Sequence, residues 1–158
     1  MDVAATPQPV DLGILLALAF QEFVRELREA HVRAGFDDLG RSDGVVFRAL
    51  AAGPMTVSDL AARLEISKQG AGQIVDDMQQ RGYLERRPDP QDGRARLVFL
   101  SERGTLALAE ARRFHRRYER RLVREHGAEA VAALRRLLEV IAGGEQQTVD
   151  PHLRALYL

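Results

Sequence analysis

Residues 56–100 read TVSDLAARLEISKQGAGQIVDDMQQRGYLERRPDPQDGRARLVFL, and this segment predicts two short helices followed by a hairpin. Thr56 and Asp59 have the spacing of a capping box, which starts a helix by satisfying two free backbone amides. Ser67 is a good N-cap for a second helix, and Gly82 stands where a terminating glycine is expected. Two short helices joined by a tight turn have the spacing of a helix-turn-helix.

After Gly82 the apolar pattern changes from a helical period to the alternation of strands. Residues 83–87 and 94–100 predict two short strands. The residues between them, Asp89-Pro90-Gln91-Asp92-Gly93, are of types that favour a turn, and they end in Asp-Gly. A hairpin directly after the second helix of a helix-turn-helix is a wing.

Helices are also predicted on both sides of this segment. Residues 10–34 carry an apolar stripe at helical spacing that is broad for a surface helix, so a second apolar partner is expected to cover it. Ser42 can cap a further helix that stops before Gly53-Pro54. Beyond the wing, Ser101 caps a long helix to about His126, and a shorter helix follows Gly127. The predicted fold class is mainly α with a small β-hairpin wing.

The composition excludes several classes of function. The chain has 158 residues, no cysteine, and a formal net charge of zero from 23 basic and 23 acidic residues. Without cysteine there is no disulfide, thiolate metal site or cysteine nucleophile. No motif of an enzyme is present, so no catalytic residue and no cofactor are expected. The four histidines, His31, His115, His126 and His152, lack metal-ligand spacing.

A membrane span is not expected either, because the longest apolar run, from Ile14 to Phe20, is too short. The first ten residues also make a poor signal peptide, since Asp2 is their only charged residue. We therefore expect a cytoplasmic protein.

The order of these elements resembles the MarR family of bacterial winged helix-turn-helix regulators. The resemblance covers nearly the whole chain and is sharpest in the wing, where the family pattern D-P-x-D-x-R corresponds to residues 89–94. A hydrophobic strand and Leu100-Ser101-Glu102-Arg103-Gly104, similar to the family's L-T-x-x-G, follow. The chain departs from many relatives at Gly93, where they have arginine, and at Gly70 and Gly72 inside the second helix of the motif.

The resemblance implies a homodimer in which the terminal helices of two chains interlock. It divides the chain into a mobile arm at 1–9, a helical dimerisation region at 10–34 and 102–158, and a winged helix-turn-helix lobe at 35–101. A two-fold dimer with two recognition helices predicts a palindromic DNA site with half-sites about one helical turn apart.

The candidate contacts to DNA lie in the second helix and the wing. Glutamine can pair with adenine, and an arginine at a hairpin tip can enter a narrow minor groove. The candidates are Ser67, Lys68, Gln69, Gly70, Gln73, Arg86, Arg87, Arg94 and Arg96. The resemblance adds Asp92, which would stabilise the wing by pairing with a neighbouring arginine. Residues 63–96 hold seven basic and six acidic residues, so the placement of the charges must carry the binding, and ordinary solvated charges remain the alternative.

The resemblance also implies a small effector, often an aromatic or phenolic anion, bound between the dimer helices and the lobe. The candidate lining residues are Phe20, Phe36, Phe47, Phe114, His115 and Tyr118, and plain core packing is the alternative for each. Seven arginines between Arg112 and Arg124 form either a solvated helix face or an anion-accepting wall.

Together these observations predict a transcriptional repressor that binds a palindromic operator as a homodimer and is released by a small molecule. The alternative is a winged-helix module for protein interaction or scaffolding without specific DNA binding.

Overall fold

A computed structural model describes residues 10–142, so the predicted arm at 1–9 and residues 143–158 of the predicted dimerisation region lie outside the described residues. Along the chain, the elements are α1 (Leu12–Arg33), α2 (Asp43–Leu50), β1 (Met55–Thr56), α3 (Val57–Arg63), α4 (Lys68–Gln80), β2 (Leu84–Pro88), β3 (Arg96–Leu100), α5 (Glu102–His126) and α6 (Ala128–Ile141).

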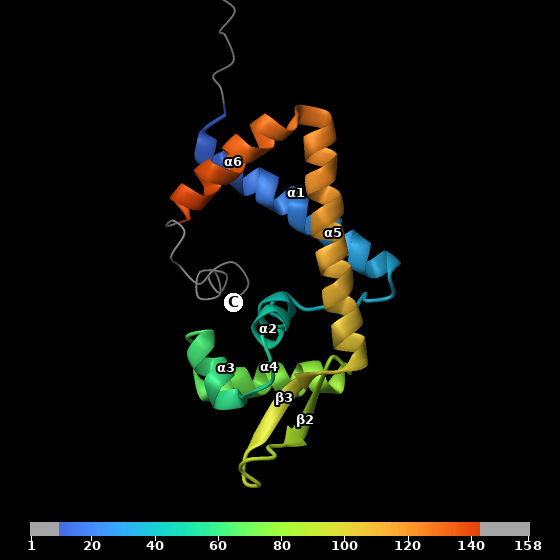
Figure 1. The fold of residues 1–158 in the computed structure, drawn as a ribbon, viewed down its shortest axis with the longest axis vertical. Coiled ribbons are helices and arrows are strands. Elements are labelled where there is room, and N and C mark those ends of the chain that lie inside the picture. The colour runs from blue at the N-terminus through green and yellow to red at the C-terminus, as the bar shows by residue number, and fades with distance from the viewer. Residues whose placement is uncertain (1–9, 143–158) are drawn as a thin grey trace, which may run out of the picture.

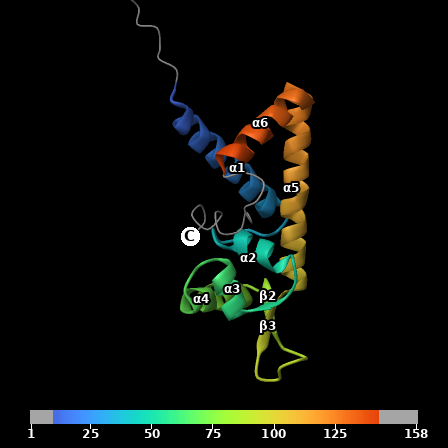
Figure 2. The same ribbon diagram turned by 60° about the vertical axis from the view of Figure 1, so that its left-hand side comes forward.

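The elements form two regions joined by α5 (Figure 1). The first region, the lobe, holds α2, α3, α4 and the sheet, and the β2–β3 hairpin projects from it (Figure 2). In the second region α1 and α6 cross beside the distal part of α5. This arrangement confirms the mainly helical fold with a small wing.

The sheet has three antiparallel strands in the order β1-β3-β2, where the sequence predicted two. Met55 pairs with Val98 and Thr56 with Leu97, while β2 pairs along the whole of β3. The prediction missed β1 because two residues are too few to show an alternating pattern. The extra strand is significant because it joins the start of α3 directly to the wing.

Most predicted helix ends are confirmed. Thr56 and Asp59 make both hydrogen bonds of the capping box, and Gly82, with a φ of 78°, ends the turn after α4. Ser42 was predicted to cap α2, but its side chain makes no capping hydrogen bond. The carboxylate of Asp43 instead accepts a hydrogen bond of 2.8 Å from the backbone N–H of Gly40.

The core lies in the lobe, where α2, α3, α4 and the sheet bury one apolar cluster around Tyr83, Leu60, Met78 and Val98. The start of α5 is fixed to this core through the backbone. Ser101 donates to the carbonyl of Gly82 at 2.6 Å and accepts from the N–H of Gly104 at 3.0 Å. A Cβ on Gly104 would lie 2.1 Å from the carbonyl oxygen of Tyr83, so this close approach requires glycine.

Candidate nucleic-acid interface

Helix α4 presents one polar face to solvent and one apolar face to the lobe. Its Ala71, Val75 and Met78 are buried in the core, and Ile74 is half-buried. Lys68, Gln69 and Gln73 are exposed in its N-terminal half. The structure therefore brings together the three side chains that the sequence singled out for contact with base edges.

The two glycines of α4 differ in their surroundings. Ser67 accepts a hydrogen bond of 3.0 Å from the N–H of Gly70, and a Cβ at Gly70 would lie 3.1 Å from the Ser67 hydroxyl oxygen. Glycine at position 70 thus leaves room for the cap. A Cβ at Gly72 would meet nothing within 4 Å, so no packing reason for glycine exists there among the described residues.

The wing turn is held by backbone hydrogen bonds. The Asp92 carboxylate accepts from the N–H of Arg94 at 3.0 Å, and the Asp89 carboxylate accepts from the N–H of Gln91 at 2.8 Å. The resemblance implied an arginine side chain as the partner of Asp92, and the structure places a backbone amide there. The side chain of Arg94 is exposed in the turn before β3 and makes no ion pair within residues 10–142.

The other wing arginines divide into two kinds. Arg86 donates to the Gln79 side chain at 2.9 Å and pairs with Asp76 at 2.6 Å, so its guanidinium connects β2 to α4. Arg87 pairs with Glu85 and lies 4.8 Å from the centre of the Phe99 ring. Arg96 is exposed at the start of β3, without an ion pair to the described part of the chain.

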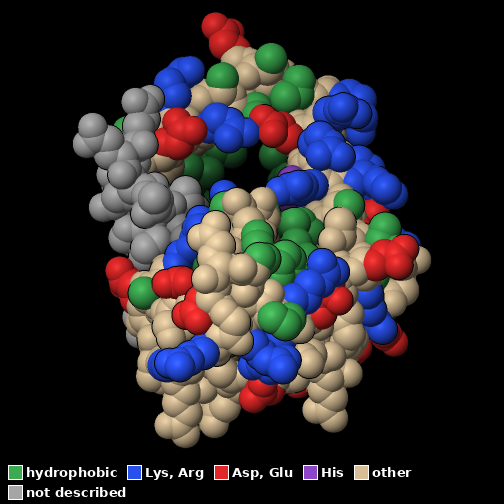
Figure 3. All heavy atoms as spheres, turned by 60° about the horizontal axis from the view of Figure 1, so that its bottom comes forward, with side chains coloured by type: hydrophobic (Ala, Val, Ile, Leu, Met, Phe, Trp, Pro, Cys, Tyr) green, Lys and Arg blue, Asp and Glu red, His purple; other side chains and the backbone are tan. Residues whose placement is uncertain are grey.

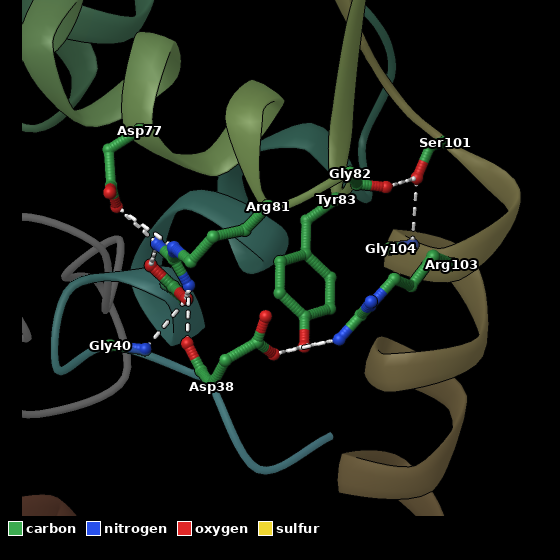
Figure 4. A network of polar contacts seen from close by, with 10 residues as sticks. Asp38, Gly40, Asp77, Arg81, Gly82, Tyr83, Ser101, Arg103 and Gly104 are labelled. Carbon is green, nitrogen blue, oxygen red and sulfur yellow. Dashed lines mark hydrogen bonds and ion pairs between the residues drawn. The ribbon is translucent and has the colours of Figure 1, made fainter. Parts of the chain in front are cut away.

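A polar network behind α4 was not predicted (Figure 4). The guanidinium of Arg81 holds the buried carboxylate of Asp43 through both oxygens, at 2.6 and 3.0 Å, and donates to the carbonyl of Asp38 at 2.7 Å. It also binds Asp77, one turn earlier in α4. Arg81 entered the sequence analysis only as one basic charge, because its partners lie about 40 residues away and no local pattern marks them.

The same network continues to the start of α5. Asp38 accepts hydrogen bonds from the hydroxyl of Tyr83 and, at 2.8 Å, from Arg103. The hydrogen bond from Tyr83 lowers the pKa of Asp38, and burial raises the pKa of Tyr83. The loop between α1 and α2 is thereby attached to α4, β2 and α5 at once.

The six candidate effector residues do not gather at one place. Phe47 and Phe36 pack with Tyr83 in the lobe, at ring distances of 5.7 and 6.4 Å. Phe114, His115 and Tyr118 of α5 instead surround Phe23 of α1, at 5.4, 5.3 and 5.0 Å. Phe20 is half-buried on α1. Phe23 was missed because its position fits the ordinary apolar stripe of that helix.

Two histidines lie near this aromatic group. Burial lowers the pKa of His31, whose Nε2 is 3.3 Å from the carbonyl oxygen of Ala107. Burial, together with the charge of Arg48, lowers the pKa of His115. Between residues 10 and 142 no three metal-ligating side chains are placed to share an ion, and His152 lies outside the described residues. None of the described helices is both long and apolar enough to span a bilayer.

A helix-turn-helix formed by α3 and α4, followed by the β2–β3 wing and backed by α2, defines a winged helix-turn-helix protein. Residues 37–95, which include α2, β1, α3, α4 and β2 and end just before β3, match the family model described as MarR family. This part of the chain is therefore similar to the MarR family. Comparison with curated proteins finds no match.

Solved structures share this fold across most of the chain. Wild-type MarR from E. coli, in its apo form, is 23% identical, with a TM-score of 0.59, over 85% of this chain and 98% of that one. FabT from Streptococcus pneumoniae, in complex with DNA, is 19% identical, with a TM-score of 0.68, over 82% and 90%. A mutant MarR from E. coli, complexed with operator DNA, is 24% identical, with a TM-score of 0.61, over 84% and 94%.

Proposed function

We propose that this protein is a transcriptional repressor of the MarR family that reads a palindromic operator through the N-terminal half of α4 and the wing. The observation that carries this proposal is the exposed row of Lys68, Gln69 and Gln73 beside the first turn of α4. Amides of that turn favour a phosphate, and the side chains can reach base edges in the major groove. DNA-bound structures of MarR and FabT, which share the fold, support the same partner.

The wing would supply the second contact. Arg94 and Arg96 are exposed and free of ion pairs with described residues, whereas Arg86 and Arg87 are engaged with Asp76 and Glu85. We assign the minor groove to Arg94 and a backbone phosphate to Arg96. Arg86 and Arg87 contribute phosphate contacts only if their present partners release them.

A homodimer is the state in which we expect the protein to act. Two helices of the second region, α1 and α6, expose large apolar side chains among the described residues, and Leu12, Leu137 and Val140 are 68%, 62% and 74% exposed. The others on these helices are Ile14, Leu15, Leu16, Leu18, Val32, Leu134, Leu138 and Ile141. A contiguous apolar surface of this kind marks an interface, and a second copy offers the same surface in return. We propose the region 10–34 and 102–158 for dimerisation and 35–101 for DNA binding.

We place the effector against the aromatic group between α1 and α5. Phe23, Phe114 and Tyr118 offer ring faces, and Arg48 and His115 offer positive or polar groups to a small aromatic anion. A ligand at this crossing would change the separation of the two lobes in the dimer and release DNA. The protein would act in the cytoplasm, where the operator is accessible.

The test is binding to the DNA just upstream of its own gene, across a salt series. We expect Arg94→Ala to weaken binding by about 1–3 kcal/mol and Lys68→Ala to weaken it comparably. Arg33→Ala, an exposed arginine of α1, is the control and should bind like wild type. An intact dimer that binds no upstream fragment would instead favour the protein-interaction module.

A further inference from the structure

The side of α5 that faces away from α1 carries a run of arginines. We call this set the α5 arginine stripe, and all of its members are exposed. It consists of Arg112, Arg113, Arg116, Arg117, Arg120 and Arg124. Basic side chains gather along the α5 edge of the molecule in Figure 3. At 1.5 Å per residue the stripe is about 18 Å long.

The stripe is poorly neutralised. Arg113 and Arg117 share the single carboxylate of Glu110, each at 3.1 Å. Glu119 is turned toward α6, where it binds Arg135 at 2.6 Å. The remaining four arginines, Arg112, Arg116, Arg120 and Arg124, form no ion pair with any residue from 10 to 142. A chain of zero net charge thus concentrates unpaired positive charge on one face of one helix.

This concentration works against the helix itself. Arginines at positions i and i+4, such as Arg112 with Arg116 and Arg116 with Arg120, repel each other and destabilise a helix. Arg121 of α5 differs from the stripe, because it has a structural role. It binds both oxygens of Glu26 at 2.8 Å and fixes α5 to α1. The stripe fixes nothing within the described chain, so its charge is available to an external anion.

The chemistry of the stripe selects among possible polyanions. A protein partner would need apolar or aromatic anchors at the centre of the contact, and a membrane would need apolar side chains to insert. The stripe offers neither, since its positions are all arginine. Exposed apolar side chains near the stripe on α5 are few, Val123 and Leu106 among them. Forked guanidinium groups match a row of phosphates, and 18 Å spans about five phosphates along one DNA strand.

The position of the stripe indicates which DNA it meets. Helix α5 begins at the base of the wing, where Ser101 and Gly104 contact Gly82 and Tyr83, and it runs away from the tip of the hairpin (Figure 1). The stripe begins ten residues after the start of α5, about 15 Å from the base of the wing along the axis. We propose that the α5 arginine stripe binds the phosphate backbone of the DNA that flanks the operator. In this arrangement the flanking DNA bends past the wing toward α5. Flanking DNA is tethered there by the lobe, and this raises its effective concentration above that of a second duplex. The inference rests on the proposed operator binding.

The experiment compares two duplexes with the same operator. One ends at the wing contact, and the other is extended by about 15 base pairs on each side. At about 3.4 Å per base pair, this extension is long enough to pass the wing strands and the first 15 Å of α5 and to reach along the stripe. Wild type is compared with Arg116→Gln/Arg120→Gln, and Arg28→Gln/Arg33→Gln on α1 is the matched control with the same loss of charge. Affinity is measured by fluorescence anisotropy across a salt series. Energy transfer between dyes at the two ends of the extended duplex reports bending.

We expect wild type and the control to bind the extended duplex more tightly, with a salt slope steeper by about 0.9 for each added phosphate contact, and to bring its ends closer together. The stripe variant should bind the short duplex like wild type. At low salt, its affinity for the extended duplex should be about tenfold or more below that of wild type. It should also leave the extended duplex straighter. Its thermal midpoint should not fall, because like-charge repulsion is removed.

Equal affinity, slope and end-to-end distance for wild type and the stripe variant on the extended duplex would overturn the proposal. If polyglutamate bound wild type but not the variant while duplex length had no effect, the stripe would be a protein-docking surface and the DNA assignment would be wrong. Failure of wild type to bind even the short duplex would overturn the proposed function, and that outcome is distinct from the others.

Discussion

At the scale of single residues, Arg81 and Asp43 determine how α4 sits on the lobe. Asp43 is 2% exposed, and its carboxylate is fully used by Arg81 and the N–H of Gly40. Buried carboxylates are retained only when paired and hydrogen-bonded, because an isolated buried charge is strongly unfavourable. The pair therefore fixes the C-terminal end of α4 against the start of α2.

We expect Asp43→Asn to lower the free energy of unfolding by roughly 2–4 kcal/mol, because Arg81 would lose its buried counter-charge while keeping Asp77. Asp77→Asn is the matched control, since it removes an exposed carboxylate from the same guanidinium, and it should cost less than about 1 kcal/mol. Urea denaturation at fixed protomer concentration measures both. Equal losses would show that the burial of Asp43 is not the reason.

The contacts of single residues were predictable only where they are local. The capping box of Thr56 and Asp59 is encoded within four positions, and both of its hydrogen bonds form. The Arg81–Asp43 pair joins residues 38 apart, and no spacing rule connects them. Asp92 was assigned an arginine partner through the family resemblance, but a short side chain in a tight turn reaches the amide two residues ahead first.

At the scale of elements, α4 carries a local weakness on the side that we propose for DNA contact. Gly72 lies among the exposed Lys68, Gln69 and Gln73 in open space, although glycine inside a helix lowers stability. The sequence alone could not separate its role from that of Gly70. The structure does so, because Gly70 has a close neighbour in the Ser67 cap.

We expect Gly72→Ala to raise the free energy of unfolding by up to about 1 kcal/mol and to weaken operator binding, because the added methyl would hold the α4 backbone away from the bases. Gly44→Ala is the control, since Gly44 is an exposed glycine of α2 with equally open surroundings. It should stabilise without any effect on DNA affinity. Unchanged operator binding by Gly72→Ala would make that glycine a tolerated local weakness only.

The element boundaries themselves were predicted well where periodicity is long. The 22 residues of α1 and the 25 of α5 repeat their pattern over many turns, and both helices were placed within two residues. The wing strands begin later than predicted, at Leu84 and Arg96. The reason is that the turn from Asp89 to Ala95 uses its own backbone hydrogen bonds, which takes Arg94 out of the ladder.

At the scale of the whole molecule, the described residues expose more large apolar side chains on α6 and α1 than we expect of a monomer. The distal part of α6 contributes no buried residue, while Leu137, Val140 and Ile141 are largely exposed. The broad stripe of α1 predicted an outside partner for the same reason. What the sequence could not give is the arrangement of α1 across α6, since crossing angles depend on packing between distant segments.

We expect Leu137→Glu to convert the dimer to monomers, because a charge would be buried in the apolar interface. Analytical ultracentrifugation should show the change, and affinity for a palindrome should fall toward that for a single half-site. Leu106 is 55% exposed at the lobe end of α5, within the range 102–158 but away from the apolar side chains of α1 and α6, so Leu106→Glu is the control and should remain dimeric. A dimer of unchanged mass in the Leu137→Glu variant would place the interface elsewhere.

The missing side chain of Gly104 has a mechanical consequence. The backbones of α5 and Tyr83 are in close contact there, and Ser101 hydrogen-bonds to both sides of the junction. We therefore expect the wing and α5 to move together. Helix α5 extends about 37 Å from the wing to α6. A tilt of about 5° at the end of α5 that we propose for dimerisation would move the wing end by about 3 Å, enough to break a hydrogen bond of the proposed contact with DNA. The close contact that Gly104 permits would thus transmit a small change in the tilt of α5 to the wing.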